Sequence, residues 1–432
     1  MGNNKVNSIS GWGRYPVIDS VALSFNSQSL WSEFFVPVGN HRSYGDAALA
    51  SFHLPMRDHN CFIEFDENNG LLTCQAGVLL SEIIDVFLSR GWFLAITPGS
   101  KLVTVGGAVA SDVHGKNHHI EGCFSECIDS IELLFPNDEL IICSRSANAD
   151  LFYATCGGMG LTGIITKVSL FLKPVNSQWI RQSTVKTTSL EHTFEAFEKN
   201  KGQPYSVAWI DCMASGESLG RSILTVGRFA DDGDLNYKPA TKISVPFDFP
   251  SCFLNSFSVL AFNKIYYGTT PDVESFQKVS VDSFFYPLDS INNWNRIYGK
   301  YGFVQLQFIL PIQVSFVGLK RILDFISKAR LGSFLAVLKL YGPQNRNFLS
   351  FPIEGYSLAL DFKMQQGLPE FISQLTDVAI KLGGRVYLAK DALLTKDQFN
   401  QSYSKANEFR ELRKDFKLDK HFHSLLSRRL NL

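Results

Sequence analysis

Residues 97–117 have the sequence TPGSKLVTVGGAVASDVHGKN, which combines four glycines with a lone histidine. Two similar stretches lie on either side of it: PVGNHRSYGD at residues 37–46 and CGGMGLTGI at residues 156–164. Glycine permits positive φ angles and close approach of a ligand to the backbone. Successive N–H groups in such loops can bind phosphate oxygens, and Arg42 and Ser43 would add donors. One such loop indicates only a tight turn, but three, each after a predicted strand, favour a dinucleotide held by several loops.

Other nucleotide-binding signatures do not fit the sequence. No G-x-G-x-x-G segment joins a predicted strand to a following helix, and no G-x-x-x-x-G-K-[ST] segment occurs. The glycine loops therefore predict neither a Rossmann fold nor a P-loop.

The sequence around the loops predicts a mixture of short strands and helices. In the first 175 residues, strands are expected at 31–38, 61–65, 71–77 and 161–174, and a hairpin at 131–144. A helix is expected at 81–90, capped by Ser81 and ended by Gly91. Farther along, strands are expected at 206–213, 303–311, 333–342, 357–362 and 385–390, and helices at 318–330, 369–382 and 406–416.

Length and composition limit the class of protein. With 432 residues, 45% of them hydrophobic, the chain is too long for one ordinary core and predicts two domains. Its 41 basic residues balance 41 acidic residues, which excludes a strongly basic nucleic-acid-binding surface. The eight cysteines are scattered and predict reduced thiols rather than a metal site. The first residues lack the apolar segment of a secretory signal, which favours a cytoplasmic location.

Residues 246–267, PFDFPSCFLNSFSVLAFNKIYY, form a dense aromatic segment in a chain that has 36 phenylalanines. One interpretation is a buried strand or helix of the second domain. The other is an apolar surface that meets a lipid chain or a membrane. The sequence leaves both interpretations open.

Several segments resemble a known family of flavoproteins. The likeness is carried by GWGR (11–14), GNHRSYGDAAL (39–49), TVGGAVASDVHGKNHH (104–119), LFYATCGGMGLTGII (151–165) and GGRVYLAKD (383–391). Together they resemble the decaprenylphosphoryl-β-D-ribose 2′-oxidase family, within the vanillyl-alcohol-oxidase type of protein, which has a PCMH-type FAD-binding domain. The likeness spans nearly the whole chain, and HGKNHH and YLAKD are its most specific parts.

The resemblance implies an α+β fold in two domains. Residues 1–175 and 385–432 would form the FAD-binding domain, and residues 176–384 a substrate domain whose antiparallel sheet covers the flavin. The implied cofactor contacts are Gly39, Asn40, His41, Arg42, Ser43, Tyr44, Gly45, Asp46, Gly99, Thr104, Val105, Gly106, Gly107, His114, Gly115, Lys116, Asn117, Ile164 and Tyr387. Many relatives outside this family carry a flavin-bonded histidine directly before the loop serine. Arg42 holds that position here, with His41 one residue earlier, so non-covalent FAD is expected.

The resemblance also implies catalytic and substrate-binding residues. Lys390 in YLAKD is the first candidate for binding the substrate hydroxyl or stabilising charge on the reduced flavin, and His114 is the second. The implied substrate-binding residues are Tyr44, Tyr286, Gln305, Gln307 and Lys339. Gln305 and Gln307 alternate with apolar neighbours, so both are expected on one face of a strand. Lys339 has apolar neighbours and needs an anion, either a substrate phosphate or a carboxylate such as Asp361.

The implied activity is FAD-dependent oxidation of the 2′-hydroxyl of a polyprenyl-phosphoryl-β-D-ribose to the 2′-keto sugar. A short-chain dehydrogenase/reductase that converts the ketone to the arabinose isomer is the implied partner. The lipid-linked substrate also suggests peripheral contact with the inner face of a membrane. Two alternatives remain: an FAD-dependent oxidase of a soluble alditol or aldonolactone, and a flavin-binding partner of the reductase without turnover.

Overall fold

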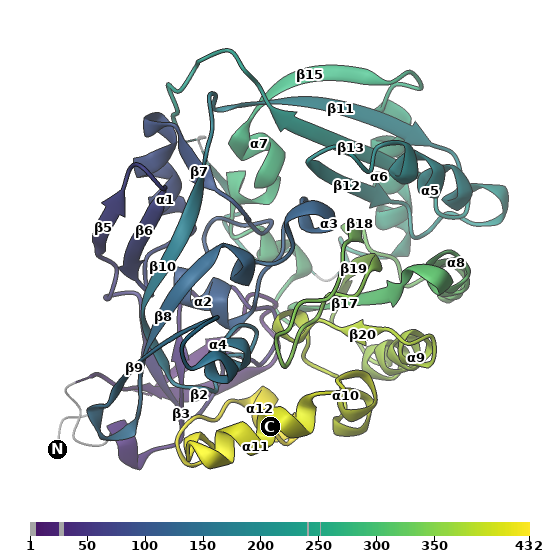
Figure 1. The fold of residues 1–432 in the computed structure, drawn as a ribbon. Helices are drawn as coiled ribbons and strands as arrows, with labels where there is room; N and C mark the ends of the chain where they lie inside the picture. Colours follow the sequence, from purple (N-terminus) through teal and green to yellow (C-terminus); the bar gives the residue numbers. More distant parts are fainter. Residues whose placement is uncertain (1–5, 26–29, 240–241, 251) are drawn as a thin grey trace.

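The computed structural model describes residues 6–25, 30–239, 242–250 and 252–432, which form three main sheets with helices around them (Figure 1). The first sheet is small and has the strand order β1-β2-β4-β3. Its strands are β1 (Val6–Ser10), β2 (Val17–Ala22), β3 (Phe35–Val38) and β4 (Phe52–Pro55). Because β3 ends where the first glycine-rich loop begins, this sheet positions that loop.

The second sheet has the order β5-β6-β10-β8-β9, with the short strand β7 also paired to β10. Its strands are β5 (Phe62–Asp66), β6 (Leu71–Gln75), β7 (Trp92–Leu94), β8 (Ile128–Leu134), β9 (Leu140–Ser144) and β10 (Ile164–Pro174). Helix α1 (Leu80–Phe87) packs against β7, and α2 (Val105–Ala110) packs against β10. The glycine-rich stretch of residues 97–117 therefore contains a helix that lies on this sheet.

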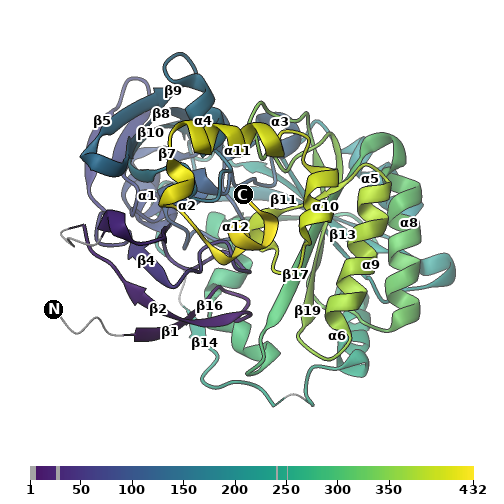
Figure 2. The same ribbon diagram turned by 90° about the horizontal axis from the view of Figure 1, so that it is seen from below.

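The third sheet has eight antiparallel strands in the order β15-β11-β13-β12-β18-β19-β17-β20. Its strands are β11 (Trp179–Thr187), β12 (Tyr205–Ile210), β13 (Ser222–Phe229), β15 (Ser275–Ser280), β17 (Phe303–Pro311), β18 (Ala336–Tyr341), β19 (Gly355–Lys363) and β20 (Arg385–Val386). Helices α5 (Leu190–Lys199), α8 (Ile312–Ala329) and α9 (Leu368–Lys381) lie side by side on one face (Figure 2). Side chains alternate along a strand, so every second residue of β17 and β19 points away from these helices. Gln307 is one of them, and it contacts His114.

The C-terminal segment returns to the first sheet. Helices α10 (Lys396–Ser402), α11 (Ala406–Asp415) and α12 (Leu425–Leu430) follow β20 and run back towards β3 at the bottom of Figure 1. Arg429 donates to both carboxylate oxygens of Asp46, at 3.0 and 2.8 Å, and to Asp391 at 2.9 Å. The C-terminal helix is thereby tied to the loop that follows β3. The domain boundaries near residues 175 and 384 stay a prediction.

Most of the predicted elements are confirmed. The hairpin consists of β8 and β9 with a turn at Pro136–Asp138, and the three later helices correspond to α8, α9 and α11. The strand predicted at 31–38 is β3, which is shorter than predicted. It begins at Phe35, because a short 3₁₀ helix at Leu30–Ser32 precedes it. All eight cysteines are free thiols, as predicted.

Two local predictions are wrong. Ser81 does not cap its helix, because α1 begins at Leu80 and the Glu82 carboxylate accepts the backbone N–H of Leu79 at 2.8 Å. The strand expected at 385–390 ends at Val386, and residues 388–390 form a 3₁₀ turn. This turn allows the carbonyl of Ala389 to bond the loop after β3.

The aromatic segment is largely exposed, so of the two interpretations left open by the sequence, the buried element is wrong. It forms helix α6 (Ser256–Thr269) and the chain before it, and several of its phenylalanines point to solvent. Only Val259 and Asn263 of the helix are buried. No helix in the described ranges is both long and apolar enough to cross a bilayer.

The Arg429 contacts predict a role in stability and cofactor retention. Arg429→Gln would leave the buried carboxylates of Asp46 and Asp391 without their cation, which costs about 3 kcal/mol or more for a buried ion pair. We expect a lower free energy of unfolding in urea and a weaker hold on FAD. Arg428→Gln, an exposed change on the same helix, is the control and should match the wild type. Equal stability of the two variants would contradict this role.

Candidate active site

The loop of residues 39–46, here called the cofactor loop, is held by three segments that lie far apart in the sequence. Trp12 N donates to a loop carbonyl at 2.7 Å. The Asn40 side chain donates to Leu102 O at 2.7 Å. Ala389 O accepts a loop N–H at 3.0 Å. The N-terminal segment, the second glycine-rich stretch and the C-terminal segment therefore meet at this loop.

Glycines let the cofactor loop and α2 lie in close contact. A Cβ added to Gly39 would lie 2.2 Å from Thr104 Oγ1, and one added to Gly106 would lie 2.8 Å from the Cβ of Ala76. The Thr104 hydroxyl also caps α2, where it accepts the N–H of Gly107 at 3.1 Å. A side chain at Gly39 would push the loop away from the start of α2, and one at Gly106 would push α2 away from Ala76, which follows β6.

His114 is buried between the second and third sheets. Its Nε2 accepts a hydrogen bond from Gln307 Nε2 at 2.9 Å, and its ring lies 4.8 Å from the ring of Tyr387. Burial, with a further contribution from Lys339, holds the pKa of His114 well below its usual range. The ring is therefore neutral, with its proton on Nδ1. It can orient a ligand, but in this arrangement it has no free lone pair to accept a proton.

Lys390 lies against Tyr44, with its Nζ 3.4 Å from the centre of the tyrosine ring. Burial lowers the pKa of Lys390, the carboxylate of Asp361 opposes that shift, and Lys339 adds to it. A lysine in this setting exchanges its proton far more readily near neutral pH than an exposed lysine does.

Asp361, on β19, lies beside Lys390. From the sequence it is predicted only as a possible partner of Lys339, not as a residue of the site. It accepts hydrogen bonds from Gln305 and, at 3.3 Å, from Tyr298, and burial raises its pKa. The predicted alternative of a salt bridge between Asp361 and Lys339 is wrong. Burial lowers the pKa of Lys339 to about 8, and within the described residues no carboxylate offsets this shift. Asp361 acts on Lys390 instead.

Three partly buried lysines, Lys116, Lys339 and Lys390, give the site an excess of basic groups. Burial, with a further contribution from Lys339, lowers the pKa of Lys116 to about 7. Lys339 also lowers the pKa of Lys390, so Lys339 lies close enough to repel both Lys116 and Lys390. Asp361 is the carboxylate that opposes Lys390 among the described residues. This arrangement suits an anionic ligand.

Comparison with known proteins decides the family. Residues 33–144 match a family model described as an FAD binding domain. The chain is 32% identical to the decaprenylphosphoryl-beta-D-ribose oxidase of Mycolicibacterium smegmatis, over 98% of this chain and 97% of that protein. The chain belongs to this oxidase family. The L-gulonolactone oxidase of Bos taurus is also similar, with 26% identity over 40% of this chain and 38% of its own length.

Family membership confirms the main expectations from the sequence. The protein is an FAD-dependent oxidoreductase with a PCMH-type FAD-binding domain and an α+β fold that mixes helices with antiparallel sheets. The residues that hold the cofactor and the substrate are not given by this comparison, so their roles depend on the geometry.

The cofactor loop fits FAD. Among the described residues, buried polar atoms on three successive loop positions have no partner within the chain: His41 Nδ1, Arg42 Nε and Ser43 Oγ. A Cβ on Gly99 would meet nothing within 4 Å, so the space in front of the second stretch is open. Unpaired donors beside open space suit phosphate oxygens. Asp46 differs from its neighbours, because Arg429 already binds its carboxylate.

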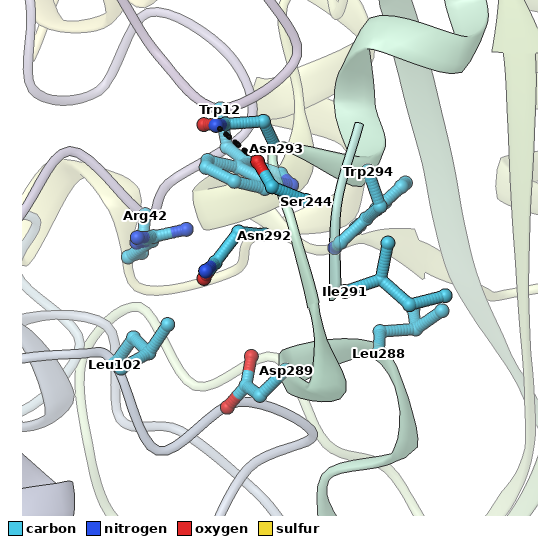
Figure 3. Close-up of a pocket in the computed structure, with 10 residues that line it drawn as sticks. All are labelled: Trp12, Arg42, Leu102, Ser244, Leu288, Asp289, Ile291, Asn292, Asn293 and Trp294. Atoms are coloured by element: carbon cyan, nitrogen blue, oxygen red, sulfur yellow. Dashed lines mark hydrogen bonds between the residues drawn. The ribbon is translucent and has the colours of Figure 1, made fainter. Parts of the chain in front are cut away.

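A cavity of about 270 Å³ lies beside the cofactor loop (Figure 3). Arg42 and Asp289 lie on its wall, and the Arg42 guanidinium lies 4.0 Å from the centre of the Trp12 ring. Asp289 accepts hydrogen bonds from Ser100 at 2.9 Å and from the N–H of Lys101 at 2.7 Å. Pockets for drug-sized ligands have volumes of roughly 300–1,000 Å³, so this cavity has room for only part of a dinucleotide.

The remaining residues predicted to contact FAD or substrate make hydrogen bonds within the protein or lie at the ends of helices and strands. Tyr286 is buried, and its hydroxyl shares a 2.6 Å hydrogen bond with Thr97. The Tyr387 hydroxyl donates to Ser111 O at 2.7 Å. The others are Val105 at the start of α2, Gly115 after His114, Asn117, which donates to Ala95 O at 2.9 Å, and Ile164 at the start of β10. Their contacts with FAD and substrate stay predictions.

Gly39→Ala tests the cofactor loop. The new Cβ would clash with Thr104 and displace the loop, so we expect FAD to dissociate at least about tenfold more readily, a change of ~1.4 kcal/mol. The measurement is the amount of flavin that stays with the protein through dialysis. Acid precipitation then releases this flavin into solution, where it is quantified. Release should be complete for the wild type, because the expected attachment is non-covalent. Gly202→Ala, where a Cβ meets nothing within 4 Å, is the control. Flavin that stays in the precipitate would contradict the non-covalent attachment.

Proposed function

We propose that this protein oxidises the 2′-hydroxyl of a polyprenyl-phosphoryl-β-D-ribose to the 2′-keto sugar, the first half of an epimerisation that yields the arabinose donor. The observation that carries the proposal is the group of partly buried lysines, Lys116, Lys339 and Lys390, whose lowered pKa values an anionic ligand would offset. A sugar phosphate supplies one. The match to a decaprenylphosphoryl-beta-D-ribose oxidase over nearly the whole chain supports the same substrate class.

Lys390 is the group that we assign to the hydroxyl proton of the substrate. Bound FAD supplies the acceptor for the hydride that leaves the carbinol carbon. Neutral Lys390 takes the proton from the oxygen, and the Asp361 carboxylate stabilises the ammonium form that results. His114 is less suited to this step, because Gln307 already occupies its Nε2 lone pair.

The third sheet supplies groups for the sugar and the phosphate. Gln305 and Gln307 lie two residues apart on β17, on the face that meets His114. Their amides can bond sugar hydroxyls. Lys339, on β18, is the group that we assign to the phosphate, because no carboxylate within the described residues offsets the cost of burying it.

The product of this step is a ketone that a second enzyme must reduce. We propose that a short-chain dehydrogenase/reductase takes the keto sugar and returns hydride to the opposite face, and that the two proteins work together. The lipid-linked substrate supports a location at the inner face of a membrane, where such a substrate is anchored.

A second candidate function is oxidation of a soluble alditol or aldonolactone. The similarity to an L-gulonolactone oxidase favours it, but this covers 40% of the chain. A flavin-binding partner of the reductase without turnover is the third candidate, and the set of Lys390, Asp361 and His114 argues against it.

Anaerobic reduction of the flavin separates these candidates. We expect polyprenyl-phosphoryl ribose to abolish the absorption band near 450 nm, and free alditols and aldonolactones to leave it unchanged. Bleaching by a soluble sugar alone would select the second candidate. No bleaching with any of these compounds would select the third.

The dependence of kcat/KM on pH tests the assignment of Lys390. Activity should rise with pH as Lys390 loses its proton, at a pH well below the usual lysine pKa of about 10.4. Because Asp361 raises the pKa of Lys390, this rise should move to lower pH in Asp361→Asn. Because Lys339 lowers it, the rise should move to higher pH in Lys339→Met.

Lys390→Ala is the reference variant for this series. It should keep its FAD and lose about 10²–10⁴-fold in turnover, the usual contribution of a positioned acid–base group. Near-normal turnover in Lys390→Ala, or shifts of the same sign in the other two variants, would remove Lys390 from this role.

A further inference from the structure

Tyr298 is the last residue of the 3₁₀ turn Trp294–Tyr298, which comes before β17 in the chain. Its side chain is only 1% exposed, and its hydroxyl donates to Asp361 Oδ2 at 3.3 Å. The side chain of Gln305 donates to the other oxygen of the same carboxylate, Oδ1. Both oxygens of this buried carboxylate are therefore bonded by neutral donors.

Stacked aromatic rings hold the Tyr298 side chain in place. Its ring centre lies 4.2 Å from that of Phe303 and 5.6 Å from that of Phe334, with the rings tilted by 19° and 22°. Phe303 is fully buried and packs edge-on against Tyr44, with 5.4 Å between the ring centres. Because Tyr44 lies against Lys390, packed rings connect Tyr298 to the aromatic side chain that faces the lysine.

The turn that carries Tyr298 is tied to the N-terminal segment. The side chain of Asn295 donates to Trp12 O at 3.0 Å, and Trp12 N donates to a carbonyl of the cofactor loop at 2.7 Å. Gly302, which follows the turn, has a φ of +69°, and a Cβ there would lie 2.2 Å from Gly13 O. The position of the turn is therefore fixed relative to the cofactor loop.

The bonds to Asp361 bear on the charge of Lys390. Burial raises the pKa of Asp361, and the bond from Gln305, the charge of Lys390 and the bond from Tyr298 lower it again. Burial also lowers the pKa of Lys390, and the charge of Asp361 opposes that shift. The other titratable groups that act on this pair, or are acted on by it, are Lys339, Tyr44 and His114.

We infer that Tyr298 is a positioning residue for the proposed oxidation, and that its hydroxyl holds the Asp361 carboxylate in place as the counter-charge of Lys390. This role rests on the proposed function, in which Lys390 takes the hydroxyl proton. Tyr298 acts through Asp361, so its hydroxyl matters only while residue 361 carries a negative charge.

Competitive acetylation of the FAD-containing protein tests this role without any substrate. Acetic anhydride acylates a neutral amine and not an ammonium group, so the pH midpoint for acetylation of Lys390, followed by mass spectrometry, reports its pKa. Tyr298→Phe keeps the stacked ring and removes the hydroxyl. We expect its midpoint to fall by up to about one pH unit, and by less than in Asp361→Asn, because a carboxylate that loses a donor is less fully charged.

Two further variants separate this role from a loss of packing. Tyr403→Phe is the matched control, because Tyr403 is also buried and its hydroxyl donates to Val386 O at 2.6 Å. Its midpoint for Lys390 should equal that of the wild type. Tyr298→Phe combined with Asp361→Asn should match Asp361→Asn alone, because the hydroxyl has no charged carboxylate left to act on.

Four results would overturn the inference. They are an unchanged midpoint in Tyr298→Phe, an unchanged midpoint in Asp361→Asn, an equal shift in Tyr403→Phe, and a further shift in the double variant. Each of them is read from labelling and does not depend on which sugar is oxidised.

Turnover of polyprenyl-phosphoryl ribose separates this inference from the proposed function. The rise of kcat/KM with pH should move to lower pH in Tyr298→Phe, by the same amount as the labelling midpoint. If the midpoints shift as expected but the wild type does not oxidise this substrate, the proposed function fails, and the effect of Tyr298 on the charge of Lys390 stands.

Discussion

The cofactor loop must touch three separated parts of the chain at once, and the rest of the site depends on this constraint. Trp12, Leu102 and Ala389 hold it from three directions. Ala389 directly precedes Lys390, so the bond that fixes the loop also fixes the backbone next to the lysine that we propose takes the hydroxyl proton. The ring of Tyr44, within the loop, then lies against the Lys390 ammonium. The cofactor loop and the proposed proton acceptor are thus held together by a few backbone bonds.

The group of partly buried lysines at the site has its own electrostatic cost. Burying an ammonium group costs free energy unless the group loses its proton or meets an anion. The site uses both solutions, because burial lowers the pKa values of Lys116, Lys339 and Lys390, and Asp361 partly offsets the shift of one of them. A substrate phosphate and the negative charge that develops on a reduced flavin would offset much of the remaining cost. The protein alone is therefore electrostatically incomplete at this site.

The sequence predicts the local elements well and the cross-strand partners poorly. Strands and helices follow from apolar periodicity, which depends on neighbouring residues only. The role of Asp361 depends on the register of β17 against β19, which places it opposite Gln305, 56 positions away in the sequence. The YLAKD motif identifies Lys390 as a candidate site residue, although the strand expected at this position is a turn. The predicted cap at Ser81 is wrong because the Glu82 side chain, not that of Ser81, bonds the backbone at the start of the helix.

Helix α6 shows why burial is harder to predict than secondary structure. A surface helix of a globular protein normally turns its apolar stripe inward. In α6 the apolar residues surround most of the helix, so the pattern does not decide which side is inside. The bond between Asn263 and Asp211 decides it, because Asp211 is fully buried and already paired with Arg221. Releasing Asn263 would leave one buried oxygen of Asp211 with fewer donors. The free-energy cost of that loss exceeds the cost of exposing one apolar side chain to water. The helix is therefore held with most of its apolar residues outward by a polar interaction inside the protein.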